Sequence, residues 1–440
     1  MAQFTTDKPK WRRMVGVLPQ VNTFWRTTAL GTPHLWCTIT TCWPFDAERD
    51  VPLAKMYLER AKGLPTTFVL RDIRSVSAGP VAEVFKAMAP TLHTLIFESK
   101  WPPAFIFERL RKEKVEFQYL RRLKASRSRA SRHAQKRFLA LVVALEQVYI
   151  KTQEFADLGR LWSQVTDFEG PFMTAETVPR IFFRAQSLCR CSLDIIFQDL
   201  GAPVQNASQH HALRTLSLTL WSPHAGLPSP LDHFPSFTNL EHFTIVANES
   251  SSVPISPFLV RSGASLLYLQ VSGPFPVGDL ILCLRYTPRL RFLYFKVDDE
   301  FQDDFVKCLV YYSISPILPE LEVLSIKGEL RLHPTTLWDV VTSRNCRLDL
   351  DPFHLSARPR KDDPPIIRPL SHIILSEEGS LEETEPPFVT VVTRLDQEYG
   401  VTLQLRQTGF YDLHRRTPQR DARDLLGFTC LDSDMSWNSE

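Results

Sequence analysis

The chain of 440 residues lacks the long apolar segments that membrane or secreted proteins carry. Its longest apolar run, Phe138–Leu145, falls far short of the roughly 20 residues that span a bilayer. The first residues, Met1–Arg13, are polar and basic, without the apolar stretch of a secretory signal. The formal net charge is only +2, so no general attraction to nucleic acid or membranes is expected. We therefore expect no membrane partner and a cytoplasmic or nuclear location.

Catalytic and metal-binding motifs are missing as well. The eight cysteines show no C-x-x-C pattern, which in a chain of this size favours reduced thiols in the core. The sequence contains no phosphate-binding loop, no dinucleotide-binding glycine motif, no zinc-protease motif and no nucleophile elbow. The nearest approach to a metal site, His210-His211 with Cys189 and Cys191, has poor spacing for structural zinc. We expect no catalytic residues, no cofactor, no metal and no enzymatic activity.

What the sequence does contain is a recurring phrase of six residues, apolar-x-x-apolar-x-apolar. Clear copies begin at Leu92, Leu213, Leu240, Leu266, Leu290 and Leu321, and weaker ones at Pro65 and Leu188. By subtraction, the copies from Leu213 onward lie 27, 26, 24 and 31 residues apart, near the period of about 20–29 residues in leucine-rich repeats.

Amphipathic stretches alternate with these phrases. Helices are predicted at residues 20–30, 51–63, 80–88, 279–286, 302–312 and 334–343. One strand and one helix per unit predict an α/β fold over residues 51–350, an irregular leucine-rich-repeat solenoid with a curved parallel sheet and helices outside. Such folds usually present a surface for binding and do not enclose a reactive pocket.

A basic segment at about 100–160 is predicted to interrupt this array as an insertion. From Arg111 to Arg137, eleven Lys and Arg residues stand against two Glu. Three interpretations remain open: a solvated basic helix or loop, a nuclear-localisation or nucleic-acid-facing patch, or a stretch that does not belong to the native coding sequence. Because aromatic residues are not interleaved through Arg121–Arg137, the sequence disfavours nucleic acid as a partner.

The C-terminal part reads as less ordered. Residues 351–414 contain paired prolines and the acidic run Glu377–Glu385, which are typical of a linker. Two strand-like pieces, Phe388–Val392 and Val401–Leu405, are candidates for a C-terminal cap. Residues 415–440 are expected to form a flexible, disordered tail.

Residues 1–50 contain a motif that resembles a known family. Residues 21–38 read VNTFWRTTALGTPHLWCT, and residues 57–65 read YLERAKGLP. This pattern resembles the second half of the F-box of a large basidiomycete-type fungal family, in which irregular leucine-rich repeats follow. Residues 1–50 are therefore interpreted as an F-box-like remnant, since only the second half of the motif is matched.

The resemblance implies an adaptor of a Skp–cullin–F-box ubiquitin ligase, which recruits a protein substrate for ubiquitin-dependent degradation. The alternative is a leucine-rich-repeat interaction scaffold that does not bind the Skp-family linker. The candidates for contact with the linker are Val21, Phe24, Trp25, Leu30, Pro33, Leu35 and Trp36. The alternative for these residues is that they cap the N-terminal end of the repeat core, a role that suits Trp36 in particular.

The repeats themselves predict where a protein substrate would bind. Side chains alternate along a strand, so positions four and six of the phrase face the core and positions three, five and seven face the concave side. These positions place Tyr268, Phe292 and Tyr294 on adjacent strands as one aromatic patch. The candidates for partner binding are His242, Tyr268, Phe292, Tyr294, Lys296 and Lys327. The alternative is that a downstream segment of the chain folds over these aromatic residues.

Overall fold

A computed structural model describes most of the chain. The described residues are 22–41, 47–70, 78–98, 104–126, 132–151, 158–174, 177–196, 209–221, 230–247, 253–296, 302–310, 317–328, 333–345, 368–377, 394–395 and 397–407. Val21, the predicted strand Phe388–Val392 and the predicted tail at 415–440 lie outside these ranges.

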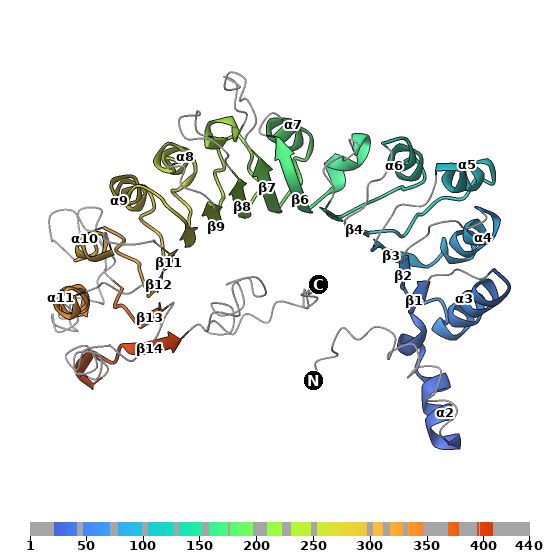
Figure 1. Cartoon of the computed structure of the whole chain (residues 1–440), viewed down its shortest axis with the longest axis horizontal. Helices are drawn as coiled ribbons and strands as arrows, with labels where there is room; N and C mark the ends of the chain where they lie inside the picture. Colours follow the sequence, from blue (N-terminus) through green and yellow to red (C-terminus); the bar gives the residue numbers. More distant parts are fainter. Residues whose placement is uncertain are drawn as a thin grey trace, which may run out of the picture.

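The dominant element is an open sheet of fourteen strands whose order follows the chain from first to last. Every neighbouring pair is parallel. Figure 1 shows the strands along the inner side of an arc and the helices along its outer side. The strands are β1 (Thr38–Thr41), β2 (Thr66–Leu70), β3 (Leu92–Phe97), β4 (Arg122–Ser126), β5 (Gln147–Lys151), β6 (Asp167–Thr174), β7 (Arg190–Ile196), β8 (Thr215–Trp221), β9 (His242–Ala247), β10 (Tyr268–Ser272), β11 (Phe292–Lys296), β12 (Val323–Gly328), β13 (His372–Glu377) and β14 (Thr402–Gln407). The prediction of an α/β fold with a curved parallel sheet is confirmed.

The connections between strands carry the helices. These are α2 (Thr23–Gly31), η1 (Pro33–Trp36), α3 (Ala47–Ala61), α4 (Ala78–Met88), α5 (Ala104–Lys112), α6 (Arg132–Leu139), η2 (Gly159–Gln164), α7 (Thr177–Arg184), η3 (Pro230–His233), α8 (Ser256–Ser262), α9 (Val277–Arg285), α10 (Gln302–Lys307) and α11 (Pro334–Asn345). All six predicted helices are present, and the fifth, α10, is shorter than the predicted 302–312. Within the described ranges, no helix combines the length and the apolar character needed to cross a membrane.

The recurring phrase explains how the sheet and helices pack. Positions one, four and six form continuous rows across the strands and are buried between the sheet and the helices. In β8 these positions are Leu213, Leu216 and Leu218, each 0% exposed. Position four of β8 is in register with the next position four, Phe243 in β9, which is also buried. Because a slip of one residue would turn this apolar set to the solvent, the phrase fixes the register.

The basic segment at 100–160 does not form the predicted insertion. Its strands β4 and β5 pair in parallel with β3, with each other and with β6, as the other neighbouring strands of the sheet do. The prediction was wrong because the phrase is present there in a less obvious form. Position six is Ala125 in β4, and in β5 position four is Val148. Arg122 and Lys124 lie at the variable positions between the core residues of β4.

The C-terminal region is also more regular than predicted. β13 lies inside the segment 351–414 that the sequence suggested to be a linker with a cap, and it pairs with β12 over six residues. The predicted strand Val401–Leu405 is present as β14, which continues the sheet beyond β13. The described part of 351–414 therefore extends the array by two units.

Polar contacts join neighbouring units on the helical side. The carboxylate of Asp279 in α9 accepts hydrogen bonds from the backbone N–H of Ile255 at 2.5 Å and of Ser256 at 3.2 Å, at the start of α8. The guanidinium of Arg344, 1% exposed, donates to the backbone carbonyls of Leu309, Leu318 and Ile317 at 3.1, 2.9 and 2.7 Å. Burial lowers the pKa of Arg344 to about 10. Each contact satisfies backbone groups that would otherwise be buried without partners.

Candidate functional site

The concave side of strands β9 to β12 carries the predicted aromatic residues in one group. At position three, Tyr268 in β10 lies in register between His242 in β9 and Phe292 in β11. Tyr294 lies at position five of β11. The structure therefore brings these four residues together, and we call His242, Tyr268, Phe292 and Tyr294 the aromatic patch.

The rings of the aromatic patch contact one another and their surroundings. The ring centroids of His242 and Tyr268 are 5.9 Å apart, with an interplanar angle of 37°. The hydroxyl of Tyr268 donates to Oε1 of Gln270 at 3.0 Å, and Gln270 is 1% exposed at position five. The Cζ atom of Arg291 lies 5.9 Å from the ring centroid of Phe292. His242 is exposed and the three other patch residues are half-buried, so the patch presents apolar ring surface on the concave side. The alternative interpretation, in which a downstream segment folds over these aromatic residues, concerns residues outside the described ranges.

The two predicted lysines lie beside the patch on the side where the strands end. Lys296 in β11 and Lys327 in β12 occupy position seven and are in register with each other. Both are half-buried. The backbone register continues this row through Ser376 in β13 to Arg406 in β14. We call Lys296 and Lys327 the lysine rim.

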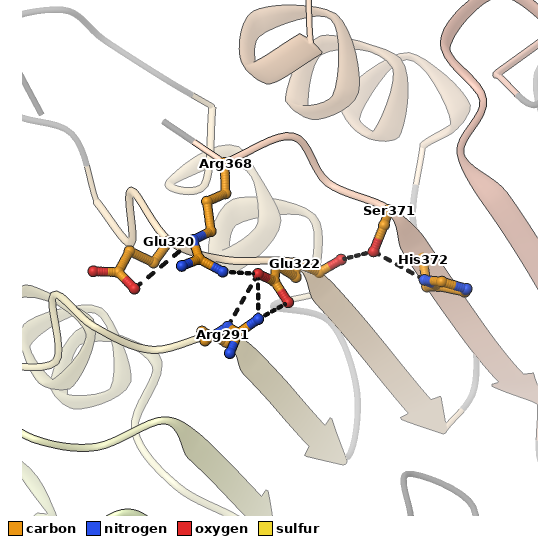
Figure 2. Close-up of polar contacts among 6 residues, drawn as sticks. All are labelled: Arg291, Glu320, Glu322, Arg368, Ser371 and His372. Carbon is orange, nitrogen blue, oxygen red and sulfur yellow. Dashed lines mark hydrogen bonds and ion pairs between the residues drawn. The ribbon is translucent and has the colours of Figure 1, made fainter. Parts of the chain in front are cut away.

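On the opposite side, where the strands begin, sequence reasoning missed an ion-pair network (Figure 2). The carboxylate of Glu322 contacts Nη2 of Arg291 at 2.7 Å through each of its oxygens and also accepts from Nη1 of Arg368. Arg368 further approaches Glu320 at 4.0 Å. Burial raises the pKa of Glu322, but the hydrogen bonds and charges of the two arginines outweigh it and hold that pKa below its ordinary value.

The same side is extended by hydrogen bonds of Ser371 and His372, at the start of β13 (Figure 2). The hydroxyl of Ser371 donates to the backbone carbonyl of Glu322 at 3.0 Å. Nδ1 of His372 lies 2.9 Å from that hydroxyl oxygen. His372 is in register with Val323, so it continues the position-three row beyond the aromatic patch. These contacts hold the start of β13 against the start of β12 and therefore stabilise the sheet.

The concave side of β4 to β7 has a different character, which sequence reasoning also missed. Positions three and five carry five charged side chains there, which we call the charged band: Arg122, Lys124, Asp167, Glu169 and Arg190. Nε of Arg190 donates to Oδ1 of Asp167 on the adjacent strand. Burial, followed by the charge of Asp167, raises the pKa of the neighbouring Tyr149. The signal that would have revealed this band is the phrase beginning at Leu120, Leu145 and Val165.

The predicted linker-contact residues divide into a core set and an exposed set. Trp36 is 1% exposed: its Nε1 donates to the carbonyl of Ala29 at 2.7 Å, and its ring centroid lies 5.2 Å from that of Tyr57. Leu35 and Pro33 are half-buried. Phe24, Trp25 and Leu30 in α2 are 70%, 44% and 39% exposed. The structure therefore assigns Trp36 to the core, as the sequence suggested, and leaves the other set on the surface.

The histidine and cysteine pairs near residue 190 have structural roles. Nδ1 of His210 accepts from the backbone N–H of Leu213 at 3.3 Å, and its Nε2 lies 2.9 Å from the carbonyl of Ala185. Burial lowers the pKa of His210 and raises that of the Cys191 thiol. Among the described residues, no group of three or more His, Cys, Asp or Glu is arranged to hold a metal ion.

In comparisons with known proteins, no protein-family model and no curated protein matches the chain.

Proposed function

We propose that this chain is a leucine-rich-repeat adaptor of a Skp–cullin–F-box ubiquitin ligase. In this proposal α2 contacts the Skp-family linker, and the concave side of the sheet holds a protein substrate. The exposed candidates for linker contact are Phe24, Trp25 and Leu30, and the aromatic patch is the candidate for substrate binding. The sequence resemblance of residues 21–38 and the architecture of one strand and one helix per unit support the repeat and adaptor assignments.

The observation that carries the proposal is the exposure of α2. This helix of nine residues buries only Ala29, although Phe24, Trp25 and Leu30 are large and apolar. Figure 1 shows α2 beyond β1, at the N-terminal end of the arc. A short helix is marginally stable in water by itself, and one with apolar side chains on several sides is normally covered by other helices. A helical partner that packs on α2 would supply that cover.

A second candidate function is a repeat scaffold that does not bind the linker. The packing of Trp36 favours it, since this residue closes the end of the core against Tyr57 and Arg60, whose Cζ lies 4.3 Å from the Trp36 ring centroid. Residues 32–36 thus cap the array whether or not a partner binds α2.

A pull-down with the purified Skp-family linker tests the adaptor function. We expect the full chain to retain the linker and the triple variant Phe24→Ala, Trp25→Ala, Leu30→Ala to lose it. The loss should be at least about tenfold in Kd, because apolar and aromatic anchors dominate protein interfaces.

Phe183 supplies the matched control, since it is also 70% exposed but lies in α7, far along the array. Phe183→Ala should bind the linker as the unmodified chain does. Failure of the full chain to bind would contradict the adaptor function and leave the scaffold.

A further inference from the structure

We infer that the outer, helical side of α5 and α6 binds an acidic segment of another protein. Its contacts are one aromatic and four basic side chains, which we call the outer basic surface: Phe105, Arg111, Lys112, Lys114 and Lys136. Figure 1 shows α5 and α6 on the outer side of the arc, whereas the strands lie along the inner side and α2 lies at the N-terminal end. The outer basic surface is therefore separate from both surfaces of the proposed function and goes beyond it.

The last turns of α5 and α6 are more basic than those of the other helices. The last turn of α5 contains Arg109, Arg111 and Lys112, and that of α6 contains Lys136 and Arg137. Each other α-helix that the structure describes has at most one basic residue there. A cation at this end is expected, because it interacts favourably with the helix dipole. The additional cations of α5 and α6 call for another explanation.

Ion pairs within the chain compensate only some of these cations. Nε of Arg109 lies 2.9 Å from a carboxylate oxygen of Glu113, and Nε of Arg137 lies 3.4 Å from one of Glu108. Four further cations are exposed and form no ion pair with any other residue that the structure describes: Arg111, Lys112, Lys114 and Lys136. These four charges are available to an anionic partner.

The two helices present their free cations on adjoining faces. Glu108 in α5 contacts Arg137 at 3.4 Å and His133 at 3.8 Å in α6, so these sides of the helices lie next to each other. Lys112 follows Glu108 by four residues, and Lys136 follows His133 by three. Because residues three or four apart share one face of a helix, Lys112 and Lys136 lie on either side of this contact.

An aromatic ring lies on the same face of α5. Phe105 is 48% exposed, although the next two residues, Ile106 and Phe107, are buried completely. It precedes Glu108 by three residues and Lys112 by seven, which places all three on one side of the helix. Aromatic side chains often anchor protein interfaces. The outer basic surface thus combines an apolar contact with free positive charge.

The acidic residues around this surface favour a protein partner over a nucleic acid. Glu108, Glu113 and Glu116 lie among the cations in the sequence of α5 and the turn after it. A nucleic acid carries a negative charge at every phosphate, so a strand that crosses this surface would pass close to these carboxylates. A protein segment can place Asp or Glu opposite the free cations alone and an apolar side chain opposite Phe105.

Fluorescence anisotropy with the full chain at low ionic strength tests the inference. Three labelled probes are compared: a peptide of twelve residues with Glu at alternate positions and one Trp, the same peptide with Gln in place of Glu, and an oligothymidylate with the net charge of the first peptide. The acidic peptide should bind at least about tenfold more tightly than either of the others.

Matched charge reversals locate the binding. Lys112→Glu with Lys136→Glu should weaken the acidic peptide by at least about tenfold. The control, Arg285→Glu with Arg289→Glu, changes the net charge of the chain by the same amount at exposed residues in α9 and the turn after it. It should have no effect on binding.

Two further variants separate the contributions to binding from effects on folding. Phe105→Ala should weaken the acidic peptide by at least about fivefold, through loss of the apolar contact. Lys112→Gln with Lys136→Gln removes the charges without placing an acidic residue at a helix end, and should lose part of the affinity that the Glu pair loses. Circular dichroism checks that each variant is folded.

Three results would overturn the inference. These are no binding of the acidic peptide, oligothymidylate binding that is as tight or tighter, and equal weakening by the control pair Arg285→Glu with Arg289→Glu. The Skp-family linker takes no part in this experiment, so its result stands apart from that of the linker pull-down.

Discussion

The concave side of β4 to β7 and that of β9 to β12 have the same backbone and a different chemistry. At positions three and five, the first region carries the charged band. The second carries the aromatic patch together with Thr244, Gln270, Val323 and Ser325, none of which is ionised. Behind both regions, positions four and six are apolar and buried. The core rows therefore set the fold, while the variable positions set what each stretch of the sheet contacts.

The two regions also differ in where their charges find partners. In the charged band, Arg190 and Asp167 pair across adjacent strands on the concave side itself. Beside the aromatic patch, Arg291 and Glu322 pair at the edge where the strands begin, outside the patch itself. Charges that pair within the sheet are partly compensated before any ligand arrives. In the proposed function, the aromatic patch is therefore the candidate for protein binding and the charged band is not.

The largest expected effect is the loss of stability when a core leucine of either region is truncated, which tests whether the two regions share one core. Leu123 in β4 and Leu269 in β10 both occupy position four and are 0% and 1% exposed. We expect Leu123→Ala and Leu269→Ala each to lower the free energy of unfolding by about 2–5 kcal/mol, through lost burial and the cavity left behind. Urea denaturation followed by circular dichroism measures both.

The surface substitution Thr215→Ala, at a half-buried position three of β8, is the control and should change the free energy of unfolding by less than about 0.5 kcal/mol. A cost below about 1 kcal/mol for Leu123→Ala alone would mean that β4 does not belong to the common core. That outcome would restore the interpretation of 100–160 as an insertion.

A smaller effect, the coupling free energy between neighbouring side chains, should differ between the two concave surfaces. Double-mutant cycles measure the coupling between Arg190 and Asp167 and that between Tyr268 and Phe292. We expect about 1 kcal/mol for the ion pair, whose Asp167 is 7% exposed, and about 0.5 kcal/mol for the cross-strand ring pair. At about 1 M salt, the first coupling should fall and the second should persist, because the Debye length shrinks to about 3 Å. Equal salt sensitivity of the two couplings would contradict the contrast between the regions.

Much of the fold was predictable because the core phrase is a local signal. Copies with leucine at position one, such as those at Leu240 and Leu266, can be read directly from the sequence. The phrase became hard to recognise where smaller or less apolar residues fill the core, as with Ala125 in β4 or Cys191 in β7. The basic side chains beside Leu123 made β4 look like a charged loop. Charge at the variable positions, however, carries no information about the buried positions.

The candidate site was predictable only in part. Once the phrase is recognised, alternation along a strand places Tyr268, Phe292 and Lys296 on the concave side. The network around Glu322 was not accessible, because Arg368 comes from a segment 46 residues later in the chain. The buried position of Arg344 was equally hidden, since arginine is normally exposed and its partners here are backbone carbonyls from two earlier segments.

The smallest expected effect concerns the ion pairs beside the aromatic patch and their response to pH. The pKa of Glu322 is lower in the folded chain than its ordinary value, because Arg291 and Arg368 together outweigh the effect of burial. A carboxyl with a lowered pKa stabilises the fold fully above its unfolded pKa of about 4.3, and this contribution is lost as the pH falls through the folded pKa. Glu322→Gln should therefore cost up to about 1 kcal/mol at pH 7 and less at pH 3, measured by urea denaturation at both pH values. A cost that stays the same at pH 3 would show that the oxygen geometry of Glu322 matters and its charge does not. The edge of the sheet where the strands begin would then be stabilised by packing and hydrogen bonds alone, as β12 is.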